Sequence, residues 1–325
     1  MRRALLASLL LVSACGGGTP TGPGPTPQAW TISGRVTNTL TGDPVGGATL
    51  ALGGQTVTAG ADGRWTLSGE GAIPTAFDAV VSASGFHTRN TRIQGENGRT
   101  NADVDIIRDA APFSLDFYRQ LARDSFDTPG QFKTTKRWIT APKFYINTTN
   151  PATGGTLSTS ELGLITNSIQ MVVPQVTGGL YQAAAIETGT TARPEQVGWI
   201  QISIVHDQAD NFCGRATIGA NPGKILFNYL PGCANICTPN AAISHTVVDH
   251  EIGHALGLYH ALGGAMDATA NHCKLQGLSD AEQVHARIVY RRPAGNSDVD
   301  RDPTSTLAQS AGGGSAHTVS CFRRR

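Results

Sequence analysis

Three of the chain's nine histidines lie within one short segment, HEIGHALGLYH, which begins at His250. In a helix, His250 and His254 would stand one turn apart on one face, so that both imidazoles could bind the same metal ion. Gly257 suits the positive φ of a turn at a helix end, and such a turn would bring His260 back toward that ion. Three protein ligands with a fourth position for water form the ligand set of a catalytic zinc site. The segment therefore predicts a site for one catalytic Zn²⁺ ion.

Glu251, directly after the first of these ligands, is the candidate catalytic residue. Because an α-helix has about 3.6 residues per turn, its side chain points roughly 100° away from that of His250. The carboxylate is then placed to hold a water molecule beside the metal and to act as its general base. The pair HExxH alone occurs by chance in many sequences, whereas the added Gly257 and His260 make the pattern much more specific.

The five residues of this pattern resemble the metzincin clan of zinc endopeptidases, whose motif HExxHxxGxxH they match at every fixed position. The resemblance implies a Met-turn beneath the zinc, and Met266 is the only methionine after the motif. It also implies that substrate specificity lies in the loop after this turn, about residues 267–278. The chain is matrixin-like with its subfamily open, because Ala261 follows the third histidine where Glu, Asp, Ser or Pro is familiar. Ala268 stands where astacins and serralysins carry a tyrosine ligand, so we expect no such ligand.

The residue patterns around the motif predict the strands and helices that would position this site. Strands are predicted for segments rich in β-branched and aromatic residues: 138–146, 184–188, 198–206 and 224–230. A helix is expected to start at Ser158 or Ser160, and Pro174 should end or kink it. The order that the resemblance implies is a twisted mixed sheet, the active-site helix, the Met-turn and a C-terminal helix.

Two further helices carry start signals. The active-site helix is predicted over residues 239–256, since the proline at its start suits the first helical position. Ser279 and Glu282 form a capping box that begins the C-terminal helix. We therefore expect an α+β, metzincin-like zinc protease domain over residues 109–325.

Residues 29–108 form a second predicted unit. They alternate apolar and polar residues in short runs separated by turns such as TGDP and ADG, which is the pattern of a small all-β sandwich. The unit looks like the carboxypeptidase regulatory-like, transthyretin-like fold that often accompanies secreted peptidases. We expect it to hold the enzyme away from the membrane, with binding of a ligand or of the cell wall as the alternative.

The N-terminus carries an export signal. Residues 1–14 combine two arginines, an apolar run and small residues, which predicts a secretory signal peptide too short to span a bilayer. Cys15 ends a segment, VSAC, that resembles the bacterial lipobox, and the Gly/Pro/Thr-rich residues 15–28 form a tether. We expect an exported lipoprotein anchored through Cys15 to the cell envelope, in the outer membrane or at the cell surface. Ordinary cleavage with an unmodified Cys15 is the alternative.

The amino-acid composition argues against nucleic acid as a partner. A net charge of +1 and a charged fraction of 15% give no electrostatic footprint for nucleic acid. Five cysteines follow Cys15, and in an exported chain they favour disulfides, by default two bridges and one free thiol: Cys213, Cys233, Cys237, Cys273 and Cys321. Their pairing cannot be read from the spacing.

Asp298, Asp300 and Asp302 have the spacing that begins an EF-hand calcium loop. Pro303 and Gln309, however, occupy positions where that loop requires glycine and glutamate. We therefore expect a solvated loop here and no calcium.

Together these patterns predict a zinc-dependent endopeptidase that hydrolyses peptide bonds of extracellular or envelope proteins, with Glu251 as general base toward a metal-activated water. Its partners would be a protein or peptide substrate and, through Cys15, a membrane. The alternative is a non-catalytic surface module for binding or adhesion with a vestigial zinc site. Three protein ligands leave one coordination position of the zinc open, which favours the enzyme over the binding module. A structural zinc site normally has four protein ligands and no open position.

Overall fold

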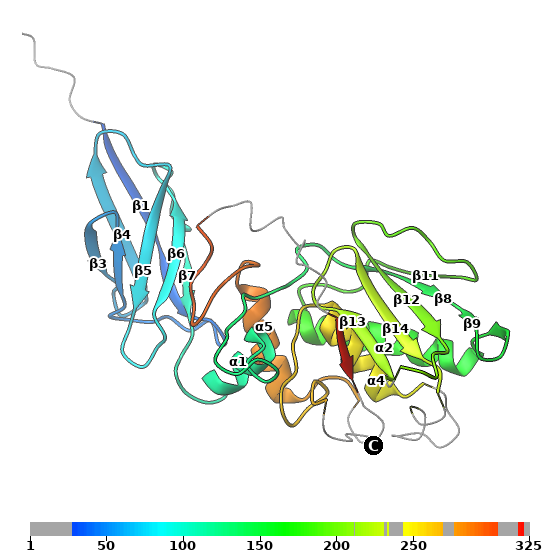
Figure 1. Ribbon diagram of the computed structural model, residues 1–325. Helices are drawn as coiled ribbons and strands as arrows, with labels where there is room; N and C mark the ends of the chain where they lie inside the picture. Colours follow the sequence, from blue (N-terminus) through cyan, green and yellow to red (C-terminus); the bar gives the residue numbers. More distant parts are fainter. Residues whose placement is uncertain are drawn as a thin grey trace, which may run out of the picture.

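The structure is a computed structural model that describes residues 28–210, 212–230, 233, 243–268, 276–304 and 318–321. Its buried apolar side chains form two clusters, and the chain passes from one to the other between Ile106 and Ile107. Figure 1 shows the strands of the first cluster at one end of the molecule and a mixed α+β part at the other. The molecule is thus of the predicted mixed α+β class.

The first cluster lies between two sheets. One has the strand order β4–β1–β7 and the other the order β3–β2–β5–β6. Inward apolar residues alternate with outward polar ones along β1, as expected for a half-buried strand. The strands are β1 (Ala29–Asn38), β2 (Thr49–Leu52), β3 (Gln55–Thr58), β4 (Arg64–Glu70), β5 (Ala76–Ser82), β6 (Arg89–Gln94) and β7 (Val104–Ile106).

The second part contains a six-stranded mixed sheet with the order β11–β8–β12–β14–β13–β15. The first four of these strands run parallel, whereas β13 is antiparallel to both β14 and β15. The strands are β8 (Lys143–Asn147), β11 (Ala185–Gly189), β12 (Trp199–Val205), β13 (Gly214–Thr217), β14 (Gly223–Asn228) and β15 (Thr318–Cys321). A short hairpin, β9 (Thr149–Asn150) and β10 (Gly155–Thr156), follows β8.

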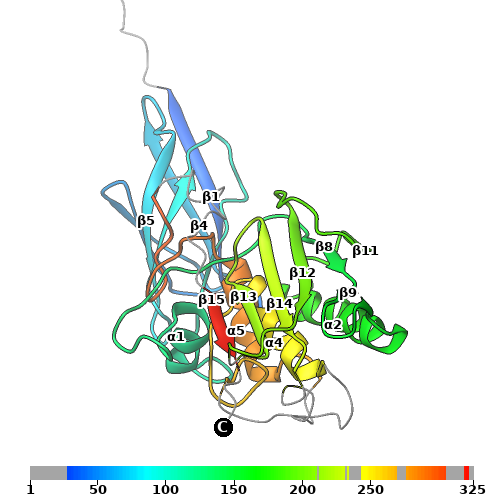
Figure 2. The same ribbon diagram turned by 45° about the vertical axis from the view of Figure 1, so that its right-hand side comes forward.

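Four helices belong to this part, among the residues that the structure describes: α1 (Leu115–Arg123), α2 (Thr159–Thr177), α4 (His245–Ala255) and α5 (Asp280–Arg291). Figure 2 shows α2, α4 and α5 together on one face of the sheet. Capping boxes start α2, at Ser158 and Glu161, and α5, at Ser279 and Glu282. The start predicted for α5 is confirmed. Within the described ranges no helix is long and apolar enough to cross a membrane.

Of the two effects predicted for Pro174, an end or a kink of the helix, the structure excludes the first. Pro174 lies inside α2, which continues to Thr177. The φ of proline is compatible with a helix, and the cost of its missing N–H is offset by burial of neighbouring apolar side chains: Ile169, Val172, Val173 and Val176. The start predicted at residue 239 for the helix that carries His250 is wrong. This helix, α4, begins at His245, because the side chain of Ser244 caps it by accepting a first-turn backbone N–H.

The four predicted strands are present, but β8 begins later than the apolar run WITAPKFYI suggests. Trp138 precedes the strand and donates its indole N–H to the carbonyl of Ala255, 2.9 Å away. β13 was not predicted, because its sequence GRAT lacks a run of β-branched or aromatic residues. β13 is extended because it pairs with β14 and β15. Tertiary contacts, and not the strand propensity of its residues, therefore determine its conformation.

Candidate metal centre

The helix α4 carries the predicted metal ligands in a fully buried setting. It contacts α2 on one side and the strands β13 and β14 on the other. All of its residues from Thr246 to Ala255 are buried. Side chains on α4 are therefore held by packing on several faces, and the histidines have little freedom to turn away from one another.

The structure brings His250, His254 and His260 together. Their ring centroids are 4.5 Å apart for His250 and His254, 5.2 Å for His250 and His260, and 4.8 Å for His254 and His260. One nitrogen from each ring lies within 4.8 Å of those of the other two, a separation from which all three could hold one metal ion. The i and i+4 spacing places the first two, and the turn after the helix adds the third.

The second nitrogen of each ring is hydrogen-bonded to an oxygen. His250 Nδ1 donates to the carbonyl of Ala265 at 2.6 Å, and His254 Nδ1 donates to that of Leu258 at 2.8 Å. A carbonyl can only accept, so Nδ1 carries the hydrogen in both rings and Nε2 is the nitrogen through which each would bind a metal. His260 Nδ1 lies 2.6 Å from the Oδ2 atom of Asp127.

The protonation of the buried rings suits metal binding. Burial and, to a smaller extent, the neighbouring His260 lower the pKa of His250 to about 3. Burial also holds the pKa of His254 well below its usual range, with His250 and His260 contributing. Both imidazoles are therefore neutral near pH 7, which is the form that binds a metal.

Gly257 forms the turn that returns the chain to the site. Its φ is 112°, in the region that side chains oppose. A Cβ atom at this position would lie 2.2 Å from the carbonyl oxygen of Lys136. The prediction that this position needs a glycine with positive φ is confirmed, and the contact with Lys136 gives a second reason for it.

Glu251 lies on α4 against the first residue of β13. Its side chain is fully buried, and a Cβ atom on Gly214 would come within 2.4 Å of its Oε1 atom. Gly214 follows Cys213, which forms a disulfide with Cys233. The disulfide therefore fixes the start of the strand against which the Glu251 carboxylate packs.

Met266 packs directly against α4. It is fully buried, and a Cβ atom on Gly253 would lie 2.4 Å from its sulfur. Glu282 of α5 holds the turn, because its carboxylate accepts the backbone N–H groups of Ala265 at 3.0 Å and Met266 at 2.6 Å. Since Ala265 is also the acceptor for His250, this turn also helps to orient a candidate metal ligand.

The sequence did not predict that Asp127 and Gly214 contact the site. It also did not predict that Glu282 accepts hydrogen bonds from the turn that contains Met266. Asp127 lies 133 positions before His260, and no local pattern marks it. Glu282 was identified only as a helix cap, although it also holds the Met266 turn. A buried acid in a first helical turn could have drawn attention to this role, because such a carboxylate needs several donors.

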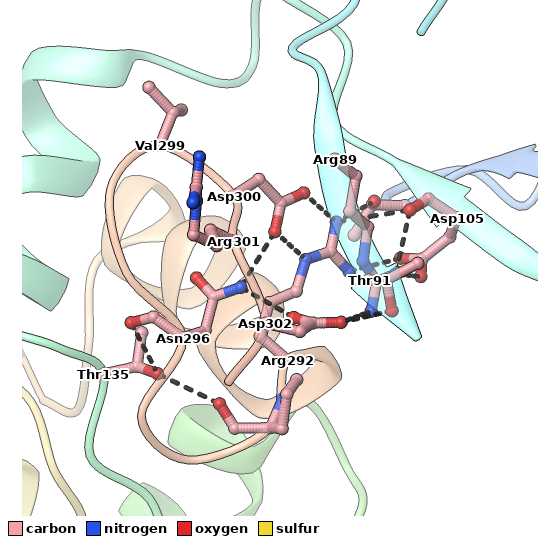
Figure 3. A network of polar contacts seen from close by, with 12 residues as sticks. Arg89, Thr91, Asp105, Thr135, Arg292, Asn296, Val299, Asp300, Arg301 and Asp302 are labelled. Carbon is pink, nitrogen blue, oxygen red and sulfur yellow. Dashed lines mark hydrogen bonds and ion pairs between the residues drawn. The ribbon is translucent and has the colours of Figure 1, made fainter. Parts of the chain in front are cut away.

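The three aspartates that resemble the start of a calcium loop do not form a solvated loop, which corrects that expectation. Each is paired with an arginine: Asp298 with Arg119 at 2.8 Å, Asp300 with Arg292 at 2.6 Å and Asp302 with Arg89 at 2.8 Å. The side chain of Asp300 is fully buried. Guanidinium groups therefore supply the positive charge that a calcium ion would bring, as Figure 3 shows for Asp300 and Asp302.

The same network joins the sandwich to the C-terminal segment. Arg292 also pairs with Asp105 of β7 at 2.7 Å (Figure 3). It donates as well to the hydroxyl of Thr39, at 2.9 Å. Burial raises the pKa of Asp105, but Arg292 and Arg89 lower it more, so that it lies well below its usual range. The carboxylate is thus ionised, and the two parts of the molecule are held by charge as well as by packing.

Several predictions fall outside the described residues. These are the signal peptide, lipidation at Cys15, most of the tether, most of the loop after Met266, and the side chains of three cysteines: Cys237, Cys273 and Cys321. One disulfide, Cys213–Cys233, is shown, and it favours an extracytoplasmic location. A second bridge and the lipid anchor stay predictions.

No protein-family profile matches the chain, and no curated protein matches its sequence. The solved structures that share limited similarity with it include the following three. The metalloproteinase-II from Bacteroides fragilis is 11% identical, with a TM-score of 0.32, over 79% of this chain and 98% of that chain. A putative membrane-associated protein of unknown function from Bacteroides fragilis is 16% identical, with a TM-score of 0.21, over 48% of this chain and 46% of that chain.

The third structure is an interface mutant of a type II cohesin–X–dockerin complex from Acetivibrio cellulolyticus. It is 16% identical, with a TM-score of 0.17, over 23% of this chain and 51% of that chain. The chain thus spans about half the length of this structure and of the membrane-associated protein. Scores this low carry no argument about function, which therefore rests on the geometry of the three histidines.

Proposed function

We propose that this chain is a zinc-dependent endopeptidase in which His250, His254 and His260 hold one Zn²⁺ ion and Glu251 is the general base. The observation that carries the proposal is the convergence of three histidine nitrogens within 4.8 Å of one another. The donor set fits zinc, because Zn²⁺ binds neutral imidazole and its catalytic sites use three protein ligands. Each ring is also oriented through its other nitrogen, as metal-binding histidines usually are.

The chemistry of peptide hydrolysis fits the residues around this centre. A bound zinc ion supplies a Lewis acid that polarises the scissile carbonyl and lowers the pKa of water. Glu251 follows the first histidine on the same helix, so its carboxylate can take the proton of the attacking water. As the C–N bond breaks, the same carboxyl group gives that proton to the leaving amine. Glu251 is fully buried, so its carboxylate is shielded from bulk water.

The substrate class follows from the location that we propose for the protein. The Cys213–Cys233 disulfide and the N-terminal export signal both favour a compartment outside the cytoplasm. We infer that the substrates are extracellular or envelope proteins. The lipid anchor at Cys15 would keep the enzyme at the envelope, where such substrates are found.

The test is cleavage of a diverse peptide library by the purified full chain, loaded with zinc, with and without a chelator. Wild type should show chelator-sensitive cleavage. Glu251→Gln should lower kcat by at least about 100-fold, the usual contribution of a general base, while zinc content stays unchanged. Glu195→Gln is the matched control, since Glu195 is exposed and distant in sequence from the motif. Its activity should equal that of wild type.

Two results would contradict this function. Glu251→Gln that cleaves as fast as wild type would remove Glu251 from the reaction. Stoichiometric zinc without chelator-sensitive cleavage of any peptide would favour the alternative, a surface binding module with a vestigial metal site.

A further inference from the structure

We propose that Asp127 is a positioning residue for the metal centre: its carboxylate orients His260 and strengthens that histidine as a ligand. The proposal rests on the proposed function only in taking the three histidines to bind a metal. It does not require that the centre cleaves peptides. Asp127 belongs to the segment after α1, so the proposal also connects this segment to the assembly of the site.

The third histidine differs from the other two in what holds it. His250 and His254 donate to carbonyls of their own local chain, 15 and 4 positions away. His260 is hydrogen-bonded to a charged side chain 133 positions away, at 2.6 Å. A hydrogen bond to an ionised carboxylate is shorter and about twice as strong as one to a neutral acceptor. His260, the proposed ligand that lies outside the helix, thus forms the strongest orienting hydrogen bond of the three.

His260 needs such an anchor because helix geometry does not fix it. Its main chain is instead held against α1 and the end of that helix. The backbone N–H of Tyr259 donates to the carbonyl of Leu121 at 2.8 Å, and that of Leu262 donates to the side-chain oxygen of Gln120 at 3.0 Å. The Phe126 ring meets the His260 ring edge to face, with centroids 6.2 Å apart. The segment 120–127 therefore contacts the His260 ring through Phe126 and Asp127 and holds the backbone of the residues beside it.

Asp127 is itself held in place by the turn that ends α1. Asp124 terminates the helix in the left-handed conformation, with φ of 63°. Thr128 donates its backbone N–H and its hydroxyl to the carbonyl of Asp124, at 3.0 and 2.8 Å. Lys133 pairs with the Asp124 carboxylate at 2.5 Å. The turn on which Asp127 lies is therefore fixed before any metal binds.

The carboxylate has one direct physical effect on the ring. It holds the hydrogen of His260 on Nδ1, which leaves Nε2 as the nitrogen that would bind a metal. The Asp127 side chain is 39% exposed, whereas that of His260 is 4% exposed. Water therefore solvates one edge of the carboxylate while the hydrogen bond itself lies toward the protein interior. Loss of such a partner typically weakens metal binding by about 10- to 100-fold.

The experiment measures the affinity of the full chain for Zn²⁺ and Co²⁺ by competition with a chromophoric chelator. Asp127→Ala should bind both metals about 10- to 100-fold more weakly. Asp127→Asn keeps an oxygen acceptor without the charge, and its affinity should lie between those of Asp127→Ala and wild type. Asp116→Asn is the matched control, because it removes an exposed acid from the first turn of α1 and should leave affinity unchanged.

The Co²⁺ absorption spectrum separates positioning from a merely structural role. A change in ligand orientation should shift the visible bands of Asp127→Asn even at saturating metal, whereas a loss of folding would lower the melting temperature of the metal-free protein. Wild-type affinity and spectrum in Asp127→Ala would overturn the proposal. Tighter metal binding in that variant would also overturn it, because the carboxylate would then oppose the metal. These readouts are independent of peptide cleavage, so a chain that binds metal but cleaves nothing would refute only the proposed function.

Discussion

The histidine centre on α4 and the arginine network around Arg292 are both buried and both contain groups of residues that resemble metal ligands. They differ in what faces those ligands. In the centre, the rings of His250 and His254 are neutral, and hydrogen bonds to oxygen atoms orient them. In the network, each aspartate carboxylate faces a guanidinium group. Residue type and spacing therefore do not identify a metal site until the charge on the opposite side is known.

The largest expected effect is that of Arg292→Met, which should lower the free energy of unfolding strongly while leaving zinc affinity almost unchanged. This change would leave the buried carboxylate of Asp300 without its arginine and that of Asp105 with Arg89 alone. Removing one partner of a buried ion pair typically costs about 3–5 kcal/mol of folding free energy. Zinc affinity at the histidines should stay within about twofold of wild type, because the side-chain ion pairs and hydrogen bonds of Arg292 within the described residues go to Asp105, Asp300 and Thr39 and to none of the proposed ligands. Urea unfolding and a zinc titration measure the two quantities.

The control for this variant is Arg64→Met, which removes an exposed ion pair with Asp62 on the sandwich. Exposed pairs contribute little, so its stability should change by less than about 1 kcal/mol. Should Arg292→Met weaken zinc binding as strongly as it lowers stability, the network and the metal centre would be one coupled unit.

A smaller effect on folding, confined to the metal centre, is expected from Gly257→Val. Positive φ alone costs a side chain about 1–2 kcal/mol, and the new Cβ would also overlap the Lys136 carbonyl. The turn must shift, which displaces His260, so zinc affinity should fall by at least about tenfold. The arginine network should keep its contribution to stability.

Gly163→Ala provides the comparison for Gly257→Val. Gly163 lies in α2 with open space around its Cβ position, and alanine favours a helix over glycine by about 1 kcal/mol. This variant should be slightly more stable and should bind zinc like wild type. Full zinc occupancy in Gly257→Val would show that His260 reaches the site without this turn.

The parts of the site that are close in sequence could be predicted from it. His250 and His254 follow from helix geometry, and Gly257 follows from the need for positive φ before His260. The capping box of α5 likewise depends on residues three positions apart. These features are predictable because one short segment contains all the groups that interact.

The parts that were missed depend on contacts between distant segments. Asp127 reaches His260 only because the end of α1 packs against the turn after α4. The start of α4 was misplaced because the sequence also offered a proline-based start earlier in the chain, whereas Ser244 forms the cap. The aspartates of residues 298–302 resembled a calcium loop because their arginine partners lie elsewhere in the sequence.

The central claim is that three histidines of this chain hold one zinc ion with a position left for water. X-ray absorption at the zinc edge, on wild-type protein dialysed against a weak chelator, tests it most directly. The result that we predict is one zinc per chain, with three histidine nitrogens and one oxygen from water at about 2.0–2.1 Å. His260→Ala measured in parallel should lose one of the three nitrogens. A spectrum with four protein ligands, with sulfur ligands, or with three histidines retained in His260→Ala would contradict the account.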